Sequence, residues 1–83
     1  MKIAIEHVSI RDALMLCKKF YSIPGNECGG SLHIVLDDGN LEDDHVLFCV
    51  RYAQENDDPL GFLVAKVLLA LSEPDREKLY KKF

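Results

Sequence analysis

The sequence predicts a single, mainly helical domain, a small bundle of three to four helices over residues 1–83. A chain of 83 residues is long enough for one domain and one core. Its composition is typical of a globular protein, because 48% of the residues are hydrophobic and 29% are charged. Three stretches repeat apolar residues at the i, i+3, i+4, i+7 spacing of a helix, and each follows a residue that favours a helix start.

The first helix is expected from Ser9 to about Tyr21. Ser9 and Asp12 form a partial capping box, in which the hydroxyl accepts a hydrogen bond from the backbone three residues later. The apolar positions that follow have helical spacing and predict a buried face; they are Ile10, Ala13, Leu14, Cys17, Phe20 and Tyr21.

The segment 30–39 leaves two alternatives open. Residues 32–36 have strand propensity, and such a strand could pair only with a short N-terminal strand in which Ile3 and Ile5 alternate with polar residues. Alternatively, Ser31 caps one or two helical turns that Gly39 terminates. We favour the helical alternative because the rest of the chain is helical.

Two further helices are expected in the middle of the chain. Asn40 is expected to cap a helix that ends near Asn56. Asp58 and Pro59 then supply an N-cap and a proline at the first helical position, and this helix extends to about Leu71. The core face of the first of these helices is Val46, Cys49, Val50 and Ala53, widened by Leu41, His45, Phe48 and Tyr52.

The helix over 60–71 is apolar on nearly all sides, which indicates either a central position or cover by another subunit. A homodimer in which this helix forms the interface is therefore one expected assembly. A last short helix follows Ser72 and Asp75, with Leu79 and Tyr80 as its apolar anchors. Its four basic residues are interpreted as the usual cations near a helix C-terminus; they are Arg76, Lys78, Lys81 and Lys82.

The net charge of −4 argues against nucleic acids and anionic membranes as partners, because both bind through basic residues. The longest apolar run, over residues 60–70, is shorter than the roughly 20 residues of a membrane span.

No signal peptide is expected, since charged residues interrupt positions 1–6. Three cysteines without a CxxC pair indicate a reducing compartment, so the cytoplasm is predicted.

One segment could hold a divalent metal ion. If residues 31–38 are helical, His33 and Asp37 lie one turn apart, and Asp44 and His45 of the next helix could complete the site. No established zinc spacing is matched. The calcium-loop pattern also fails, because Asp43 stands where that loop requires glycine.

The same segment has a second interpretation, as an acidic surface that binds a protein partner. Asp37 and Asp38 belong to a turn, and Glu42, Asp43 and Asp44 suit the first turn of a helix, where its dipole favours anions. Exposed carboxylates at these five positions would steer a basic partner.

The sequence argues against an enzyme and predicts no cofactor, a divalent metal ion being the alternative. A Cys28–His33 pair lacks a third group that would orient it as a nucleophile and base. The glycines near residue 29 do not form a phosphate-binding loop. The leading hypothesis is therefore a non-enzymatic interaction or regulatory protein.

A wider stretch resembles small uncharacterised proteins of bacteriophages and prophages. The resemblance is most specific over the GGSLHIVLDDGN segment. The residues that carry it are 24–26, 29–40, Glu42, Asp43, His45, Arg76, Leu79 and Tyr80. It implies a bacterial cytoplasm and an action on a host or phage protein. A structural or assembly module of a phage is the alternative that it implies. The group has no known activity, so the resemblance implies no mechanism.

Overall fold

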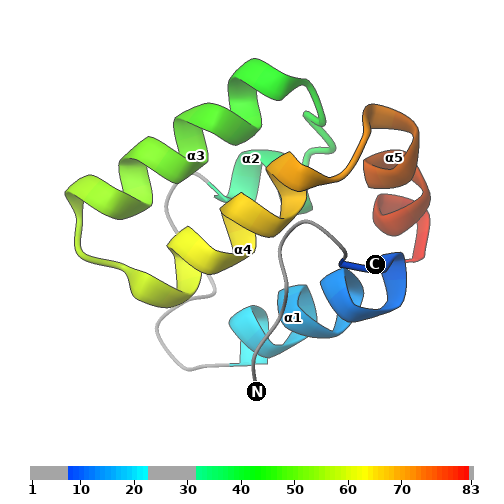
Figure 1. The fold of residues 1–83 in the computed structure, drawn as a ribbon, viewed down its shortest axis with the longest axis horizontal. Helices are drawn as coiled ribbons and strands as arrows, with labels where there is room; N and C mark the ends of the chain where they lie inside the picture. Colours follow the sequence, from blue (N-terminus) through cyan, green and yellow to red (C-terminus); the bar gives the residue numbers. More distant parts are fainter. Residues whose placement is uncertain (1–7, 23–31, 83) are drawn as a thin grey trace.

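The computed structural model describes residues 8–22 and 32–82, except for the side chains at 21, 22, 33 and 34. This part of the chain is mainly helical, with no strand (Figure 1). Four helices of ten to thirteen residues and one of five follow in the order α1 (Ile10–Ser22), α2 (Leu32–Leu36), α3 (Asp43–Glu55), α4 (Pro59–Ala70) and α5 (Glu73–Lys82).

The helical alternative for residues 32–36 is confirmed, because α2 occupies them. The alternative of a strand pairing with this segment is not supported, since a helix satisfies its own backbone groups and offers no ladder to a second strand. The N-terminal residues 2–6 of that expectation lie outside the described residues.

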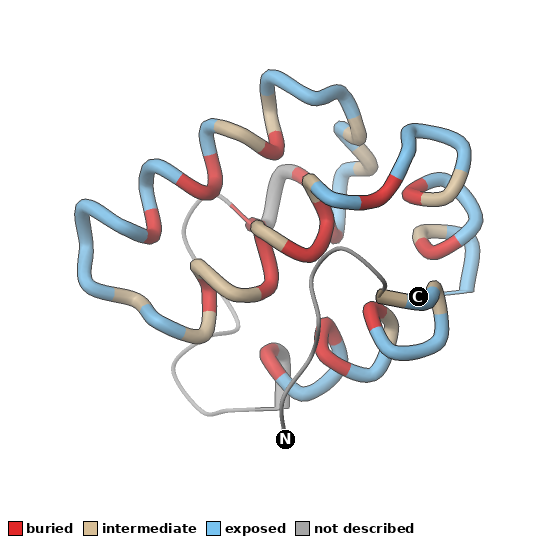
Figure 2. Tube along the Cα trace, viewed as in Figure 1, coloured by how far each residue is buried: buried red, intermediate tan, exposed pale blue. Residues whose placement is uncertain are grey.

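Helix α4 is the central element of the fold. It packs against α3 on one side and against α1 on the other, and α5 closes one end of the molecule beside α1 (Figure 1). Figure 2 shows that the buried positions of α4 face these neighbours. Packing within the fold therefore accounts for most of the apolar surface of α4; the residues of α4 that are buried are Gly61, Val64, Ala65, Val67 and Leu68. The homodimer through residues 60–71 stays a prediction.

Cys17 and Cys49 both belong to the core, as their places on the apolar faces predicted. Burial raises the pKa of the Cys17 thiol to about 12, because the core does not solvate a thiolate. Cys17 is therefore a packing residue and not a reactive thiol. Cys28 lies outside the described residues.

Three of the predicted helix starts are confirmed by hydrogen bonds. The backbone N–H groups of Asp12, Gly61 and Asp75 donate to the side chains of Ser9, Asp58 and Ser72 at 3.1, 3.0 and 3.3 Å, respectively. The prediction that Asn40 caps the third helix is wrong. The chain becomes helical only at Asp43, and Glu42, with an extended backbone, is the N-cap of α3 without a side-chain capping bond. The physical reason is a tertiary contact, because Arg76 of α5 binds Leu41 and Asp43.

The turn between α2 and α3 packs on Tyr80 of α5. Gly39 has a φ of +75°, a backbone conformation that favours glycine. A Cβ atom at this position would lie 2.9 Å from Cε1 of Tyr80. The Tyr80 hydroxyl donates to the carbonyl oxygen of Asp37 at 3.0 Å. The turn thus requires glycine both for its conformation and for the close approach of the ring.

Candidate functional site

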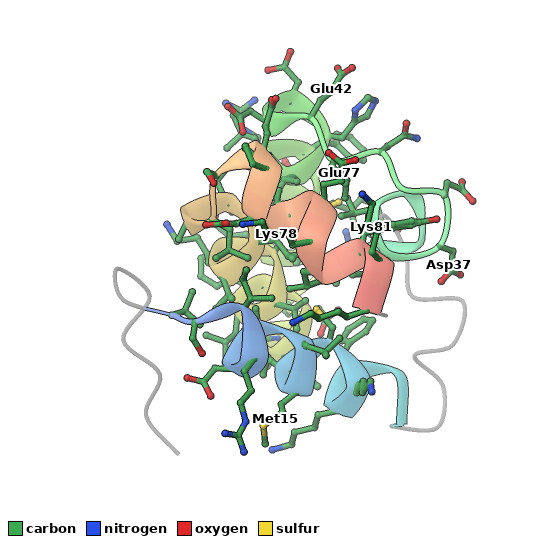
Figure 3. The ribbon with its side chains drawn as sticks, turned by 90° about the vertical axis from the view of Figure 1, so that its right-hand side faces the viewer. Met15, Asp37, Glu42, Glu77, Lys78 and Lys81 are labelled. Atoms are coloured by element: carbon green, nitrogen blue, oxygen red, sulfur yellow. The ribbon has the colours of Figure 1, made fainter. Side chains whose placement is uncertain are left out.

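The five acidic residues predicted to bind a partner all lie on the surface. Asp37 and Asp38 follow α2 in the turn, and Glu42, Asp43 and Asp44 occupy the start of α3. Figure 3 shows Asp37 and Glu42 projecting outward from the two ends of the connection between these helices. The exposure that the acidic-surface hypothesis requires is therefore present at all five positions.

One of these carboxylates binds a basic side chain of the protein itself. The guanidinium of Arg76, only 2% exposed, donates from Nη2 to Oδ1 of Asp43 at 2.5 Å. Its Nη1 donates to the carbonyl oxygen of Leu41 at 2.6 Å, and its Nε donates to that of Leu68 at 2.8 Å. A longer bond of 3.4 Å joins Nη2 to the carbonyl oxygen of Leu69.

Arg76 thus donates to two carbonyl groups in the last turn of α4, those of Leu68 and Leu69, of which the first also accepts the backbone N–H of Leu71. It also binds Leu41 and Asp43, and these contacts favour a start of α3 at Asp43 instead of just after Asn40. The interpretation of Arg76 as a C-terminal helix cation is therefore wrong. A signal was available, because Arg76 lies three residues before Leu79 and so shares the buried face of α5.

The four residues of the metal hypothesis are only partly described. No group of three His, Cys, Asp or Glu side chains in the described ranges lies close enough to hold a metal ion, so Asp37, Asp44 and His45 do not form such a group. The side chain of His33 is not described. Nδ1 of His45 lies 4.0 Å from a carboxylate oxygen of Glu42, and it has no hydrogen-bond partner. The metal site stays a prediction.

The outer face of α3 carries two aromatic side chains that the sequence analysis assigned to the core. Phe48 is 53% exposed and Tyr52 is 40% exposed, and their ring centroids lie 6.1 Å apart. The buried residues of α3 are Val46, Cys49, Val50 and Ala53. At about 100° per residue, Phe48 lies roughly 150° around the helix axis from the centre of this stripe. The wider core face predicted for this helix is therefore wrong at Phe48 and Tyr52.

A shallow groove of about 390 Å³ lies between the start of α3 and the start of α5. Leu41 and Pro74 contribute apolar surface to it, and Glu42, Glu73 and Glu77 contribute carboxylates. Glu42 and Glu77 are labelled in Figure 3, on the side of the molecule where α5 faces the viewer. The groove extends the acidic surface from α3 toward α5.

Comparison of the chain with protein-family models, with curated proteins and with solved structures finds no match. No helix in residues 8–22 and 32–82 is both long and apolar enough to cross a membrane.

Proposed function

We propose that the protein is a non-enzymatic, acidic interaction module that binds a positively charged segment of another protein. The observation that carries this proposal is the segregation of charge. Eight acidic residues and one basic residue lie between positions 37 and 58. Helix α1 carries the opposite balance, with Arg11, Lys18 and Lys19 against Asp12.

This charge segregation is also spatial. Helices α3 and α1 lie on opposite sides of α4, so the acidic segment and the basic helix face different directions (Figure 1). The ion pair with Arg76 neutralises the carboxylate of Asp43, but the other acidic residues of the segment keep this side of the molecule negative. A surface of one charge sign accelerates the approach of a partner of the other sign.

The proposed setting is the one that the phage-protein resemblance implies, a bacterial cytoplasm in which the partner is a host or phage protein. The partner's binding segment must be rich in lysine or arginine to match the acidic side. Association is expected to slow as salt is added, because salt screens attraction between exposed charges.

The test compares two charge-reversal variants as immobilised baits in a bacterial lysate. Asp38→Lys with Asp44→Lys reverses two charges on the acidic side, whereas Arg11→Glu with Lys18→Glu reverses two charges on α1. We expect the first variant to lose the basic proteins that the wild type captures and the second to retain them. Association rates of a purified captured protein should fall on the order of tenfold in the first variant alone. Equal capture by all three baits would contradict the proposal.

A further inference from the structure

The three large hydrophobic side chains exposed in the described residues are Met15, Phe48 and Tyr52. Met15 stands alone on α1, on the side of the molecule away from α3 (Figure 3). Phe48 and Tyr52 lie one helical turn apart on α3 and form a single aromatic patch. Isolated exposed hydrophobic residues are common in proteins, but a paired aromatic patch is typical of binding surfaces.

Folding gives little reason for aromatic residues at these two positions. Helix α3 packs mainly against α4, and its buried face consists of Val46, Cys49, Val50 and Ala53. A pair of aromatic rings one turn apart stabilises a helix only slightly. Phe48 and Tyr52 therefore leave apolar area in water that the rest of the fold does not cover.

The charges beside this patch indicate the chemistry of its partner. Asp44 precedes Phe48 by four residues and Glu55 follows Tyr52 by three, so a carboxylate lies near each end of the patch. Arg51 is the one basic side chain of α3. Aromatic faces attract guanidinium groups, and carboxylates bind them with two hydrogen bonds. Arginine matches both features.

We propose that the outer face of α3 docks a basic amphipathic helix of a partner protein. Its apolar residues pack on Phe48 and Tyr52, and its arginines bind Asp44 and Glu55. The distance along α3 from Asp44 to Glu55 is about 16 Å, so a docking helix of about three turns covers it. This inference rests on the proposed function, which supplies a basic partner, and adds the surface and the form of that partner.

The experiment uses the full chain, labelled with ¹⁵N, and a synthetic 15-residue helical peptide. The peptide carries leucines at i, i+3, i+4 and i+7 and arginines at most other positions. We expect the amide chemical-shift changes to concentrate on residues 44–55. Phe48→Ala with Tyr52→Ala should weaken binding at least tenfold, while Met15→Ala, which removes an equally exposed side chain, should leave the affinity unchanged.

Two further peptides separate the two proposals. A lysine peptide of the same pattern should bind the wild type more weakly than the arginine peptide, because an ammonium group neither stacks nor forms paired hydrogen bonds. This comparison needs no variant protein. A glutamate peptide of the same pattern should not bind.

Each result contrary to these expectations refutes either the docking surface on α3 or the proposed acidic function. If the aromatic variant binds normally while Asp37→Lys with Asp38→Lys, which leaves α3 unchanged, binds weakly, the docking surface is wrong and the acidic function stands. If the glutamate peptide binds as tightly as the arginine peptide, the acidic function is wrong. Shift changes confined to other helices, or none at millimolar arginine peptide, would refute docking on α3.

Discussion

The guanidinium of Arg76 on α5 and the carboxylate of Asp43 at the start of α3 are joined by a 2.5 Å hydrogen bond across 33 positions of sequence. The two ends of this ion pair differ in environment, since the arginine is buried and the aspartate is 69% exposed. Water therefore replaces the arginine as a partner of Asp43 more easily than it replaces the aspartate as a partner of Arg76.

Replacing Arg76 by alanine is expected to destabilise the protein strongly. Arg76→Ala removes a buried side chain together with its hydrogen bonds to the carbonyl groups of Leu41 and Leu68, and we expect a loss of about 3–5 kcal/mol in the free energy of unfolding. Asp43→Ala should cost less, because Arg76 keeps its hydrogen bonds to the carbonyl groups of Leu41, Leu68 and Leu69. Lys78→Ala on the same helix is the control and should change stability by less than about 0.5 kcal/mol. Urea unfolding measures all three; a loss below 1 kcal/mol for Arg76→Ala would refute the structural role of Arg76.

Gly39→Ala is expected to destabilise the turn between α2 and α3. The backbone at φ +75° disfavours a Cβ atom, and that atom would also press on the ring of Tyr80. We expect a cost above about 1 kcal/mol, measured as a lower thermal midpoint. Combining Gly39→Ala with Tyr80→Ala removes the steric contact but not the backbone strain. The effects of the two substitutions on stability should therefore be non-additive. Strictly additive losses of stability would show that the ring of Tyr80 does not contact the turn.

The buried thiol of Cys17 predicts a dependence of stability on alkaline pH. The unfolded thiol loses its proton near pH 9.0, whereas the folded thiol retains it to about pH 12. Its contribution to stability is complete below pH 9 and is lost as the pH rises toward 12. The free energy of unfolding should fall by up to about 1.4 kcal/mol per pH unit in this window.

The measurement for Cys17 compares the wild type with Cys17→Ala at pH 8 and pH 10. The variant is less stable at both values because of its cavity, but it lacks the thiol and should lose less stability between them. Equal losses would show that this thiol titrates alike in both states.

The metal hypothesis predicts that a divalent ion held by His33, Asp37, Asp44 and His45 raises the thermal midpoint of unfolding. The measurement is thermal unfolding of EDTA-treated protein with and without Zn²⁺, Mn²⁺, Mg²⁺ or Ca²⁺. An ion at 100 times its dissociation constant would add about 2.7 kcal/mol, and each kcal/mol raises the midpoint of a domain near this size by roughly 4–8 °C. A rise of that size that disappears in His33→Ala would establish the metal site, and no rise with any of the four ions would refute it.

The helix starts at Ser9, Asp58 and Ser72 were predictable because a cap depends on a few neighbouring residues. The apolar stripe of α3 and the central place of α4 were predictable from periodicity and composition. Asn40 misled the prediction because it has the chemistry of a cap, while a contact with distant Arg76 decides where α3 begins.

The candidate surface was predictable in part. Exposure of the acids at 37, 38 and 42–44 followed from their charge, since such side chains are rarely buried. The roles of Arg76 and Phe48 were not predictable in this way. Which side of a helix faces the core depends on where its neighbours pack, and both residues have the opposite burial to the one that their side-chain chemistry favours.

Helix α5 holds the acidic side of the molecule in place through two separate contacts. Arg76 binds the segment before α3, and Tyr80 binds the turn after α2. Local opening of α5 would therefore release the loop that carries the acids, and these elements form one cooperative unit. A partner that binds the acidic side in its folded form must then slow amide hydrogen exchange in α5, far from its own contacts. The shape of the acidic side is in this sense set by the last helix of the chain.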